Sequence, residues 1–277
     1  MRWLIGALLA FAVTSPAAAA DLDILRGSDV MVPPMAPVGP ATFPRWSGFY
    51  FGGDFLYNYG QADFSNATQP LVAQALQDTV VEQQFAPSQL QALGKGANNA
   101  LGFGGFLGYN SQWQDLIIGI EGNYTHTSLS MTASSPTVIS RAFSPAAGNV
   151  TSVTIDNAAG HLSLTDYGEA RARAGYIVGN VLPYGFLGFA VGRSSYNASI
   201  EVDLTCTGGG ECVGYPLMPS AGQNNALLYG FSVGGGFDWA LTQNFFLRGE
   251  VEFIQFAPFA NINVSIVDAR VGGGFKF

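Results

Sequence analysis

Eight segments of the chain alternate between two kinds of side chain with a period of two residues. In the first segment, Phe49, Phe51 and Phe55 alternate with Gly52 and Asp54. Because successive side chains of a β-strand point to opposite faces, this pattern predicts strands with two unlike faces. The other seven segments lie at 101–110, 116–124, 169–178, 187–192, 229–239, 245–253 and 267–277.

The two faces predict the environment of these strands. Almost all of the strand charges lie on the glycine-rich face, and the other face is a row of Phe, Leu, Val, Tyr and Ala. A soluble sandwich would bury its apolar faces and hydrate its surface with charge, but only 11% of the residues are charged. The pattern is typical of a closed barrel with lipid outside and a polar lumen, because open sheet edges in hydrocarbon leave backbone groups unsatisfied. We therefore expect an all-β fold, an eight-stranded antiparallel transmembrane barrel with strands of about 10–15 residues.

Composition excludes several other classes of protein. With 13% aromatic residues the chain is not disordered throughout. Its 11 Lys and Arg residues are scattered singly and form no basic patch, so a nucleic-acid partner is not expected. No apolar run reaches the roughly 18 residues that a transmembrane helix needs.

The connections between the segments differ in length. Turns at 111–114, 179–180 and 241–244 are short, whereas the connections at 60–99, 127–162 and 197–225 are long and that at 257–261 is short. Outer-membrane barrels have short periplasmic turns and long extracellular loops. The sequence thus predicts three long extracellular loops and both chain ends at the periplasmic side. Aromatic girdles would include Trp46 and Trp239 at the periplasmic end, and Tyr57 and Tyr196 at the outer end.

The N-terminal region has the composition of a secretion signal. A single Arg2, an apolar stretch and Ala18-Ala19-Ala20 predict a signal peptide over 1–20. A Pro-rich tail is expected over 21–45 and the barrel over 46–277. In the oxidising compartment that follows secretion, Cys206 and Cys212 are expected to form a disulfide across a glycine-rich loop.

Three stretches resemble a known family. They are the Pro-rich leader followed by Trp46-Ser47-Gly48-Phe49-Tyr50-Phe51-Gly52-Gly53, then Ala170-Arg171-Ala172-Arg173-Ala174-Gly175-Tyr176, and last Val271-Gly272-Gly273-Gly274-Phe275-Lys276-Phe277. They are similar to the small porin-like outer-membrane β-barrels of Gram-negative surface antigens, relatives of the OmpA transmembrane domain. The resemblance implies an eight-stranded barrel in the Gram-negative outer membrane. It also implies insertion by the barrel-assembly machinery with periplasmic chaperones, reading Val271, Phe275 and Phe277 as the assembly signal.

Charged residues on the inward face are the main candidate site. Parity places there Asp54, Glu121, Glu169, Arg171, Arg173, Asp238, Arg248, Glu250, Glu252, Asp268, Arg270 and Lys276. An eight-stranded barrel has an interior just wide enough for side chains, and buried charges must be paired. We expect an ion-pair network of Glu121, Glu169, Arg171, Arg173, Arg248, Glu250, Glu252 and Arg270 that plugs the lumen. A pairing of Arg270 with Glu250 or Glu252 is favoured. The alternative is a narrow conductive path lined by the same groups.

Other residues suggest minor alternatives. His126 and His161 are the only histidines, and if they met at the outer rim they could bind a metal or haem iron. His126 with Ser128 or Ser130 is the only visible start of a lipid-modifying site, which would also need an orienting carboxylate. The paired carboxylates Glu250 and Glu252 fit ion pairing better than hydrolysis. Residues 71–93 favour one or two short helices broken near Pro87, with Ser88 as a cap.

The sequence predicts an integral outer-membrane protein with a structural and surface-display role, not an enzyme and with no cofactor. Its alternative is a low-conductance porin. The expected partners are outer-membrane lipids and lipopolysaccharide, together with an unidentified ligand on a host cell or bacteriophage. A monomer is expected.

Overall fold

The computed structural model describes residues 44–135, 138–146, 149–208 and 216–277. The chain divides into two units, Met1–Thr42 and Phe43–Phe277, and only the second is described below. The predicted signal peptide, nearly all of the predicted tail, and Cys212 lie outside the described residues.

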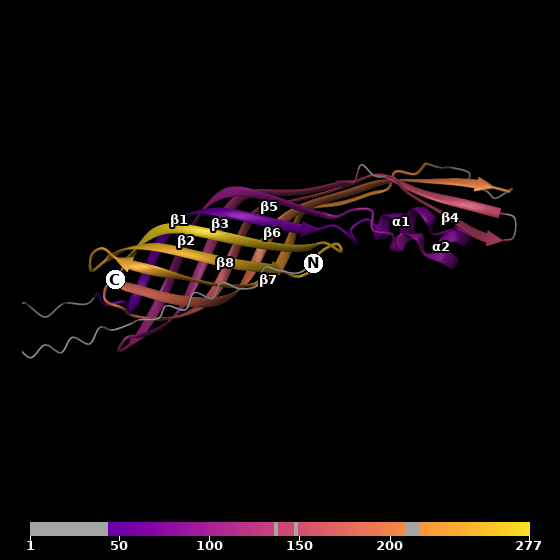
Figure 1. Cartoon of the computed structure of the whole chain (residues 1–277). Coiled ribbons are helices and arrows are strands. Elements are labelled where there is room, and N and C mark those ends of the chain that lie inside the picture. The colour runs from indigo at the N-terminus through magenta and orange to yellow at the C-terminus, as the bar shows by residue number, and fades with distance from the viewer. Residues whose placement is uncertain (1–43, 136–137, 147–148, 209–215) are drawn as a thin grey trace, which may run out of the picture. The chain divides into compact units, whose positions relative to one another are not determined.

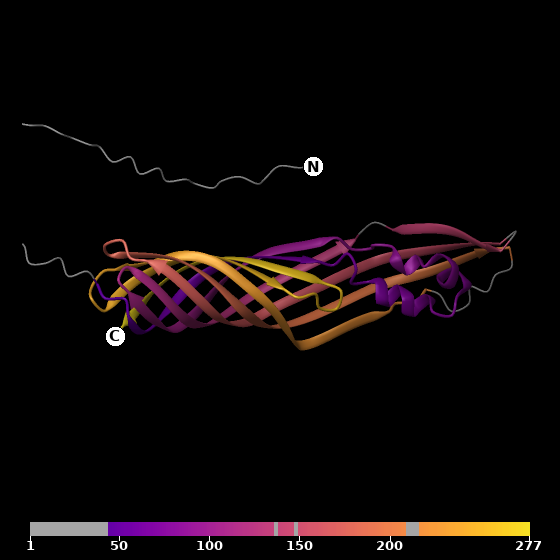
Figure 2. The same cartoon turned by 90° about the horizontal axis from the view of Figure 1, so that it is seen from below.

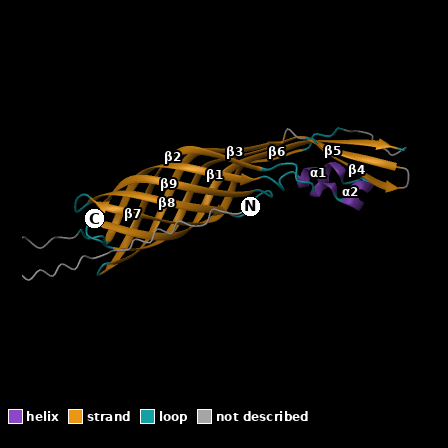
Figure 3. Ribbon diagram, in the orientation of Figure 1, coloured by secondary structure: helices purple, strands orange, loops and turns teal. Residues whose placement is uncertain are grey.

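Nine strands make up the sheet of the second unit. Their bounds are β1 (Gly48–Asp63), β2 (Lys95–Trp113), β3 (Leu116–Ser135), β4 (Ile139–Ala146), β5 (Asn149–Tyr176), β6 (Val181–Thr207), β7 (Ser220–Ala240), β8 (Phe245–Phe256) and β9 (Asn263–Lys276). Eight of them pair antiparallel with both neighbours in a closed ring ordered β1-β2-β3-β5-β6-β7-β8-β9, with β9 returning to β1. The predicted eight-stranded barrel is confirmed, and Figures 1 and 3 show its wall.

The ninth strand, β4, continues β3 rather than adding to the ring. Ser135 of β3 pairs with Ala158 of β5, and Ile139 of β4 pairs with Ile155 of the same strand. β3 and β4 therefore form one interrupted arm of a long hairpin with β5. The barrel ring itself stays eight-stranded.

Several strands are much longer than expected. β5 has 28 residues and β6 has 27, although a tilted strand crosses a membrane in about 9–11. The connections predicted at 127–162 and 197–225 are thus mostly strand, and Figures 1 and 2 show this sheet extending beyond the barrel. We call these parts of β3–β7, which lie within 127–162 and 197–225, the extension.

Register shifts explain why the extension is not predicted from the sequence. The β5–β6 pairing slips between Asp156 and Ala159 and again between Leu164 and Asp166. Each slip changes which parity faces inward, so a strict period of two breaks. Because the alternation is interrupted, these Ser-, Thr- and Ala-rich stretches lack the pattern of a strand, and the sequence predicts loops there.

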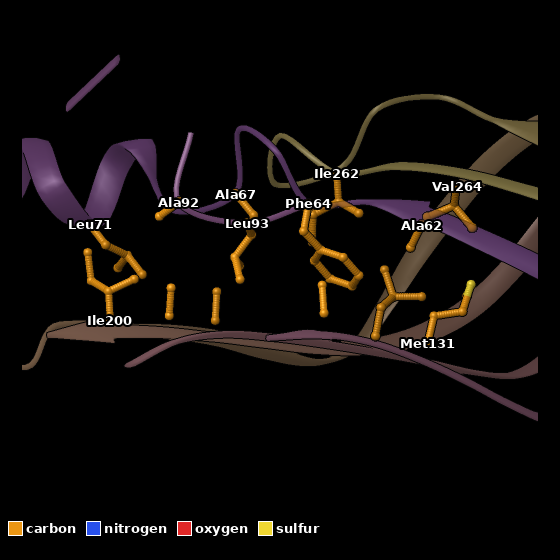
Figure 4. Packing of buried hydrophobic residues seen from close by; sticks show 14 of the residues in the cluster. Ala62, Phe64, Ala67, Leu71, Ala92, Leu93, Met131, Ile200, Ile262 and Val264 are labelled. Carbon is orange, nitrogen blue, oxygen red and sulfur yellow. The ribbon is translucent and has the colours of Figure 1, made fainter. Parts of the chain in front are cut away.

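The first long connection folds onto one face of the extension. It contains α1 (Gln69–Leu76), α2 (Val80–Phe85) and the 3₁₀ turn η1 (Pro87–Gln89). Two short helices are present as predicted, but they are separated at residues 77–79 and not near Pro87, which follows α2 and begins η1. α1 buries Leu71, Val72 and Leu76, and Figure 4 shows Leu71 against Ile200 of β6. Among the described residues, no helix combines the length and apolarity required to cross a membrane.

The cap of α2 differs from the prediction. Thr79 is the N-cap, and its hydroxyl accepts a hydrogen bond from the backbone N–H of Glu82 at 3.2 Å. Ser88 instead donates its hydroxyl to the Glu82 carboxylate. Thr79 takes the cap because it directly precedes the helix, whereas Ser88 follows it.

The barrel wall separates two kinds of side chain. Phe55 (73% exposed), Leu101 (76%) and Leu187 (68%) point outward, while Arg171 and Arg248 are each 3% exposed. This outward surface is an apolar band bounded on β3 by Leu116 and Tyr124. On the inward face, glycines leave space for the charged side chains, because a Cβ on Gly188 would lie 2.8 Å from Cγ of Arg171.

Candidate functional site: the ion-pair layer of the lumen

Twelve charged side chains are buried inside the barrel. Seven are carboxylates and five are cations, namely Asp54, Glu121, Glu169, Asp238, Glu250, Glu252 and Asp268 with Arg171, Arg173, Arg248, Arg270 and Lys276. Each lies on an inward-facing parity position of its strand. The eight residues predicted to form the network all lie in this layer.

One contact spans the lumen at Glu121. Arg248 Nη1 of β8 lies 2.8 Å from Glu121 Oε2 of β3, an ion-pair distance although the N–H is not aimed for a hydrogen bond. β8 and β3 are four places apart in a ring of eight, so they stand on opposite walls. Arg171 of β5 also donates from Nη2 to Glu121 Oε1 at 2.8 Å.

A second contact spans the lumen at Glu169. Arg270 Nη2 of β9 donates to Glu169 Oε2 of β5 at 3.2 Å, and β9 and β5 are also opposite each other. The same nitrogen lies 2.8 Å from Glu252 Oε2 and 3.1 Å from Asp268 Oδ2. Of the two partners favoured for Arg270, the structure places Glu252 in ion-pair contact.

Arg171 extends the layer to β8 at Glu250 and Glu252. Its guanidinium nitrogens lie 3.3 Å from a Glu250 carboxylate oxygen and 3.5 Å from one of Glu252. Arg173 donates to Asp238 Oδ2 of β7 at 2.6 Å. Five of the seven carboxylates thus contact an arginine from another strand, and Asp268 contacts Arg270 of its own strand β9. Buried charges of this kind are tolerated only when paired.

Tyrosines that the sequence interpretation missed complete the network. Tyr50 donates its hydroxyl to Glu121 Oε2 at 2.8 Å, and Tyr184 donates to Glu250 Oε1 at 2.6 Å. The Arg173 guanidinium lies 3.7 Å from the Tyr184 ring centroid. The alternation of side chains indicates the inward position of Tyr50, because Tyr50 lies on the same face of β1 as Gly52 and Asp54.

Asp54 is the exception to this pairing. It is 4% exposed, and neither carboxylate oxygen has a hydrogen-bond partner among the described residues. Arg171, Arg248 and Arg270 pair with other carboxylates. With seven carboxylates and five cations, the described lumen carries an excess of carboxylates.

The ion-pair layer is closed at both ends by apolar clusters. At the end of the short turns, Trp46, Tyr50, Phe106 and Phe246 pack together. At the other end, buried residues such as Leu129 belong to a cluster that continues into the extension. The polar lumen expected from the sequence is thus confined to the middle of the barrel.

The position of Trp46 differs from the predicted one in the periplasmic aromatic girdle. It is 2% exposed and lies inside, with Lys276 Nζ 3.9 Å from its ring centroid. Lys276 also donates to the backbone oxygen of Arg45 at 2.8 Å. Residues 44–47, which directly precede β1, are held against the barrel by this cation and by the aromatic cluster. Tyr196 is half-buried against Phe259 at 5.3 Å rather than in the outer girdle.

The two histidines do not meet. His126 pairs across the sheet with Asp166, whereas His161 pairs with Thr132, six residues further along β3. That separation is about 20 Å along the strand. The proposed haem or metal site of His126 and His161 is therefore not assembled.

His126 has a carboxylate partner on the outer wall. His126 Nδ1 lies 2.8 Å from Asp166 Oδ1, and Tyr124 donates its hydroxyl to the same oxygen at 2.7 Å. Both partners lie just beyond the apolar band. Among the described residues, neither Ser128 nor Ser130 hydrogen-bonds His126. An orienting carboxylate is present, but the Ser–His pair that a lipid-modifying enzyme needs is not formed.

The remaining predicted residues lie on β9, at the C-terminal residue and near the end of β6. Val271, Phe275 and Phe277 point outward at 64%, 51% and 75% exposure, and the Phe277 ring stacks on Phe51 at 5.9 Å. Cys206 lies near the end of β6, and its predicted partner Cys212 is outside the described residues. The disulfide between them stays a prediction.

Solved structures similar to this chain include small outer-membrane barrels. The attachment invasion locus protein Ail of Yersinia pestis is 13% identical, with 83% of this chain and 99% of that chain covered and a TM-score of 0.36. Neisserial surface protein A is 13% identical, covering 83% and 98% with a TM-score of 0.37. OprG of Pseudomonas aeruginosa is 12% identical, covering 83% and 96% with a TM-score of 0.37.

No protein-family model matches the chain, and the comparison with curated proteins found no significant match. The barrel architecture rests on the closed ring of strand pairs in the chain itself. An apolar band outside and a charged layer inside make it a barrel of the outer-membrane type.

Proposed function

We propose that this chain is a structural protein of the outer membrane. Its barrel is closed by the ion-pair layer and holds the extension at the cell surface. The observation that carries the proposal is the pair of contacts between opposite walls, Arg248 with Glu121 and Arg270 with Glu169. Side chains that meet across the lumen leave no room there for a solute.

Surface display is supported by the extension. Its packed core is continuous with the apolar cluster at the end of the barrel, and α1 and α2 cover one face of the sheet built from β4, β5 and β6. A packed sheet keeps a fixed shape outside the membrane, whereas a loop would not. This makes it suited to presenting a surface to a ligand on a host cell or bacteriophage.

The second candidate is a low-conductance porin that favours cations. The excess of buried carboxylates over cations supports it, because a net negative lumen attracts cations and repels anions. Conduction would require the arginines to move away from their carboxylates. That step is costly while the charges stay desolvated.

Single-channel recording separates these two candidates. The mature chain, refolded into planar bilayers and shown to shift on an unheated gel, is expected to give no steady conductance steps. Reproducible steps with cation selectivity would overturn closure and establish the porin. Protease treatment of intact cells tests display, and cleavage confined to the extension is the expected result.

The C-terminal residues also have a proposed role in inserting the barrel into the membrane. We propose that Val271, Phe275 and Phe277 are read by the barrel-assembly machinery, because they form an exposed row on the last strand. Phe277→Ser is expected to lower the amount of inserted barrel. Phe231→Ser, which changes an equally outward Phe on β7, is the control, and an equal loss in both would count against a specific signal.

A further inference from the structure

One carboxylate of the ion-pair layer has no partner. Asp54 of β1 is 4% exposed, and neither of its carboxylate oxygens accepts a hydrogen bond from a described residue. Each of the other six lumen carboxylates contacts at least one arginine. An isolated buried charge is so unfavourable that such a group usually becomes neutral instead. Asp54 is therefore a candidate for binding a species that removes its charge.

The neighbours of Asp54 across the sheet are glycines. Asp54 pairs with Gly104 of β2 on one side and with Gly272 of β9 on the other. A Cβ on Gly104 would lie 2.7 Å from Asp54 Oδ1, and one on Gly272 would lie 2.8 Å from Asp54 Cβ. Thr125 of β3 also borders Gly104, and its hydroxyl accepts a hydrogen bond from Arg270 at 3.3 Å. These neighbours on β2 and β3 leave room for the Asp54 carboxyl group and do not titrate.

The arginines that face Asp54 pair with other acids. The charged groups with the strongest electrostatic effect on Asp54 are Arg270 of β9, Arg248 and Glu250 of β8, and Arg171 of β5. The shortest N···O distances in the competing ion pairs are 2.8 Å for Arg270–Glu252, 2.9 Å for Arg248–Asp238 and 2.8 Å for Arg171–Glu121. Turning one of these arginines toward Asp54 would take that cation away from another buried carboxylate.

The charge count favours a proton as the species bound. The described lumen holds seven buried carboxylates and five cations, which leaves two negative charges unmatched. A metal ion would need several oxygen ligands at once. The described residues include no group of three or more His, Cys, Asp and Glu side chains that could hold such an ion. A proton needs only one oxygen.

We infer that Asp54 is a proton-binding site of the lumen and that the site is occupied at neutral pH. The inference rests on the proposed closure of the barrel, because closure keeps water away from this carboxyl group. The proton forms an O–H bond with one Asp54 oxygen. When the pH rises, this bond breaks, hydroxide takes the proton to form water, and Asp54 becomes charged. The charged form competes with the other acids for the arginines, so the ion-pair layer is weaker at high pH.

Infrared spectroscopy of the full mature chain detects the proton directly. The barrel is refolded in a detergent without ester groups and recorded at about pH 7, where an ordinary aspartate is ionised. A carbonyl band of a protonated carboxylic acid is expected, and it should shift when the protein carries isotope-labelled aspartate. An unchanged chain without this shifted band would overturn the inference.

Two variants assign the infrared band. Asp54→Asn should lose the intensity of one carboxyl group from the band of labelled aspartate. Asp238→Asn is the matched control, because the Asp238 carboxylate pairs with Arg173 at 2.6 Å and with Arg248 at 2.9 Å. This control should keep the band at full intensity. Undiminished intensity in Asp54→Asn would overturn the assignment to Asp54.

The pH dependence of unfolding tests the same site independently. Asp54 of the unfolded chain is ionised above about pH 5, so the folded barrel holds one more proton there. Stability then falls as the pH rises. Between about pH 5 and about pH 7, the ratio of folded to unfolded protein should fall about tenfold more per pH unit in the unchanged chain than in Asp54→Asn. Equal slopes for these two proteins would overturn the inference.

The same control applies to unfolding. Asp238→Asn should lower stability but keep the steeper pH dependence, because its ion pairs hold Asp238 charged in the folded barrel. Replacing Na⁺ by a large organic cation should change neither measurement. Stability that depends on the metal ion present would show that a metal ion occupies the site, and would overturn the proton.

Single-channel recording on the same preparation separates this inference from the proposed function. Steady conductance would count against closure of the barrel. A silent barrel that lacks the infrared band would leave closure intact and overturn the proton site alone.

Discussion

Arg248 of β8 and Glu121 of β3 stand on opposite walls of the barrel, and their charged groups lie 2.8 Å apart across the lumen. Both side chains are almost completely buried. The contact fixes the distance between the two walls at this level. Because Glu121 also binds Arg171 and Tyr50, it joins three other strands into one layer.

Removing Arg248 should strongly destabilise the barrel. Arg248→Met removes one cation from Glu121 and Asp238 and enlarges the buried excess of carboxylates, and breaking buried ion pairs in this way costs about 3–5 kcal/mol. Urea unfolding of the refolded protein in lipid vesicles measures the change. Arg141→Met, at an exposed position of β4, should alter the free energy of unfolding by less than about 0.5 kcal/mol. Equal effects would show that Arg248 is not held by the layer.

Emptying the layer should open the lumen. Arg248→Ala with Arg270→Ala removes the cations of both opposite-wall contacts, and the seven carboxylates remain. Steady, cation-selective conductance steps are expected in planar bilayers. A double variant that folds and stays silent would indicate that the aromatic cluster around Trp46 closes the barrel by itself.

The outer-wall carboxylate should titrate at unusually low pH. Hydrogen bonds from His126 and Tyr124 lower the pKa of Asp166 to about 2, against about 3.9 in an unfolded chain. Its contribution to stability is therefore present above about pH 3.9 and is lost as the pH falls through 2. His126→Ala should raise this pKa, measured by carboxyl carbon NMR. His161→Ala, a residue distant from Asp166, should leave it unchanged.

The core of the extension should depend on α1. Leu76 is fully buried, so Leu76→Ala is expected to cost about 2–5 kcal/mol of local stability. Hydrogen exchange should become faster in the extension and stay slow in the barrel. Val80→Ala, at a position 53% exposed, should have little effect. Faster exchange throughout the barrel would mean that the two parts unfold as one unit.

The sequence was most informative where the alternation is strict. Phe55 and Asp54 follow the period of two without interruption, so their opposite faces and the ring of eight strands could be predicted. The extension could not, because the slips near Asp156 and Leu164 shift the inward parity within β5. Trp46 was misplaced because its position depends on Lys276, more than two hundred residues away.

The candidate site was predictable as a set of residues but not as a set of contacts. Parity selects Glu121 and Arg248 as inward residues, yet it does not show that they meet across the lumen. That depends on the width of the closed barrel and on the space left by glycines such as Gly188. His126 and His161 illustrate the same limit, since only the register of β3 with β5 separates them.

The orientation of the wall is the central claim, and quenching of tryptophan fluorescence by lipids brominated in their acyl chains tests it most directly. Single-tryptophan proteins would carry Phe231→Trp, which faces outward at 55% exposure, or Phe246→Trp, which faces the lumen at 1%. Strong quenching at position 231 and little at position 246 is the predicted result. Equal quenching at both positions, or stronger quenching at position 246, would contradict a barrel with lipid outside and paired charges within.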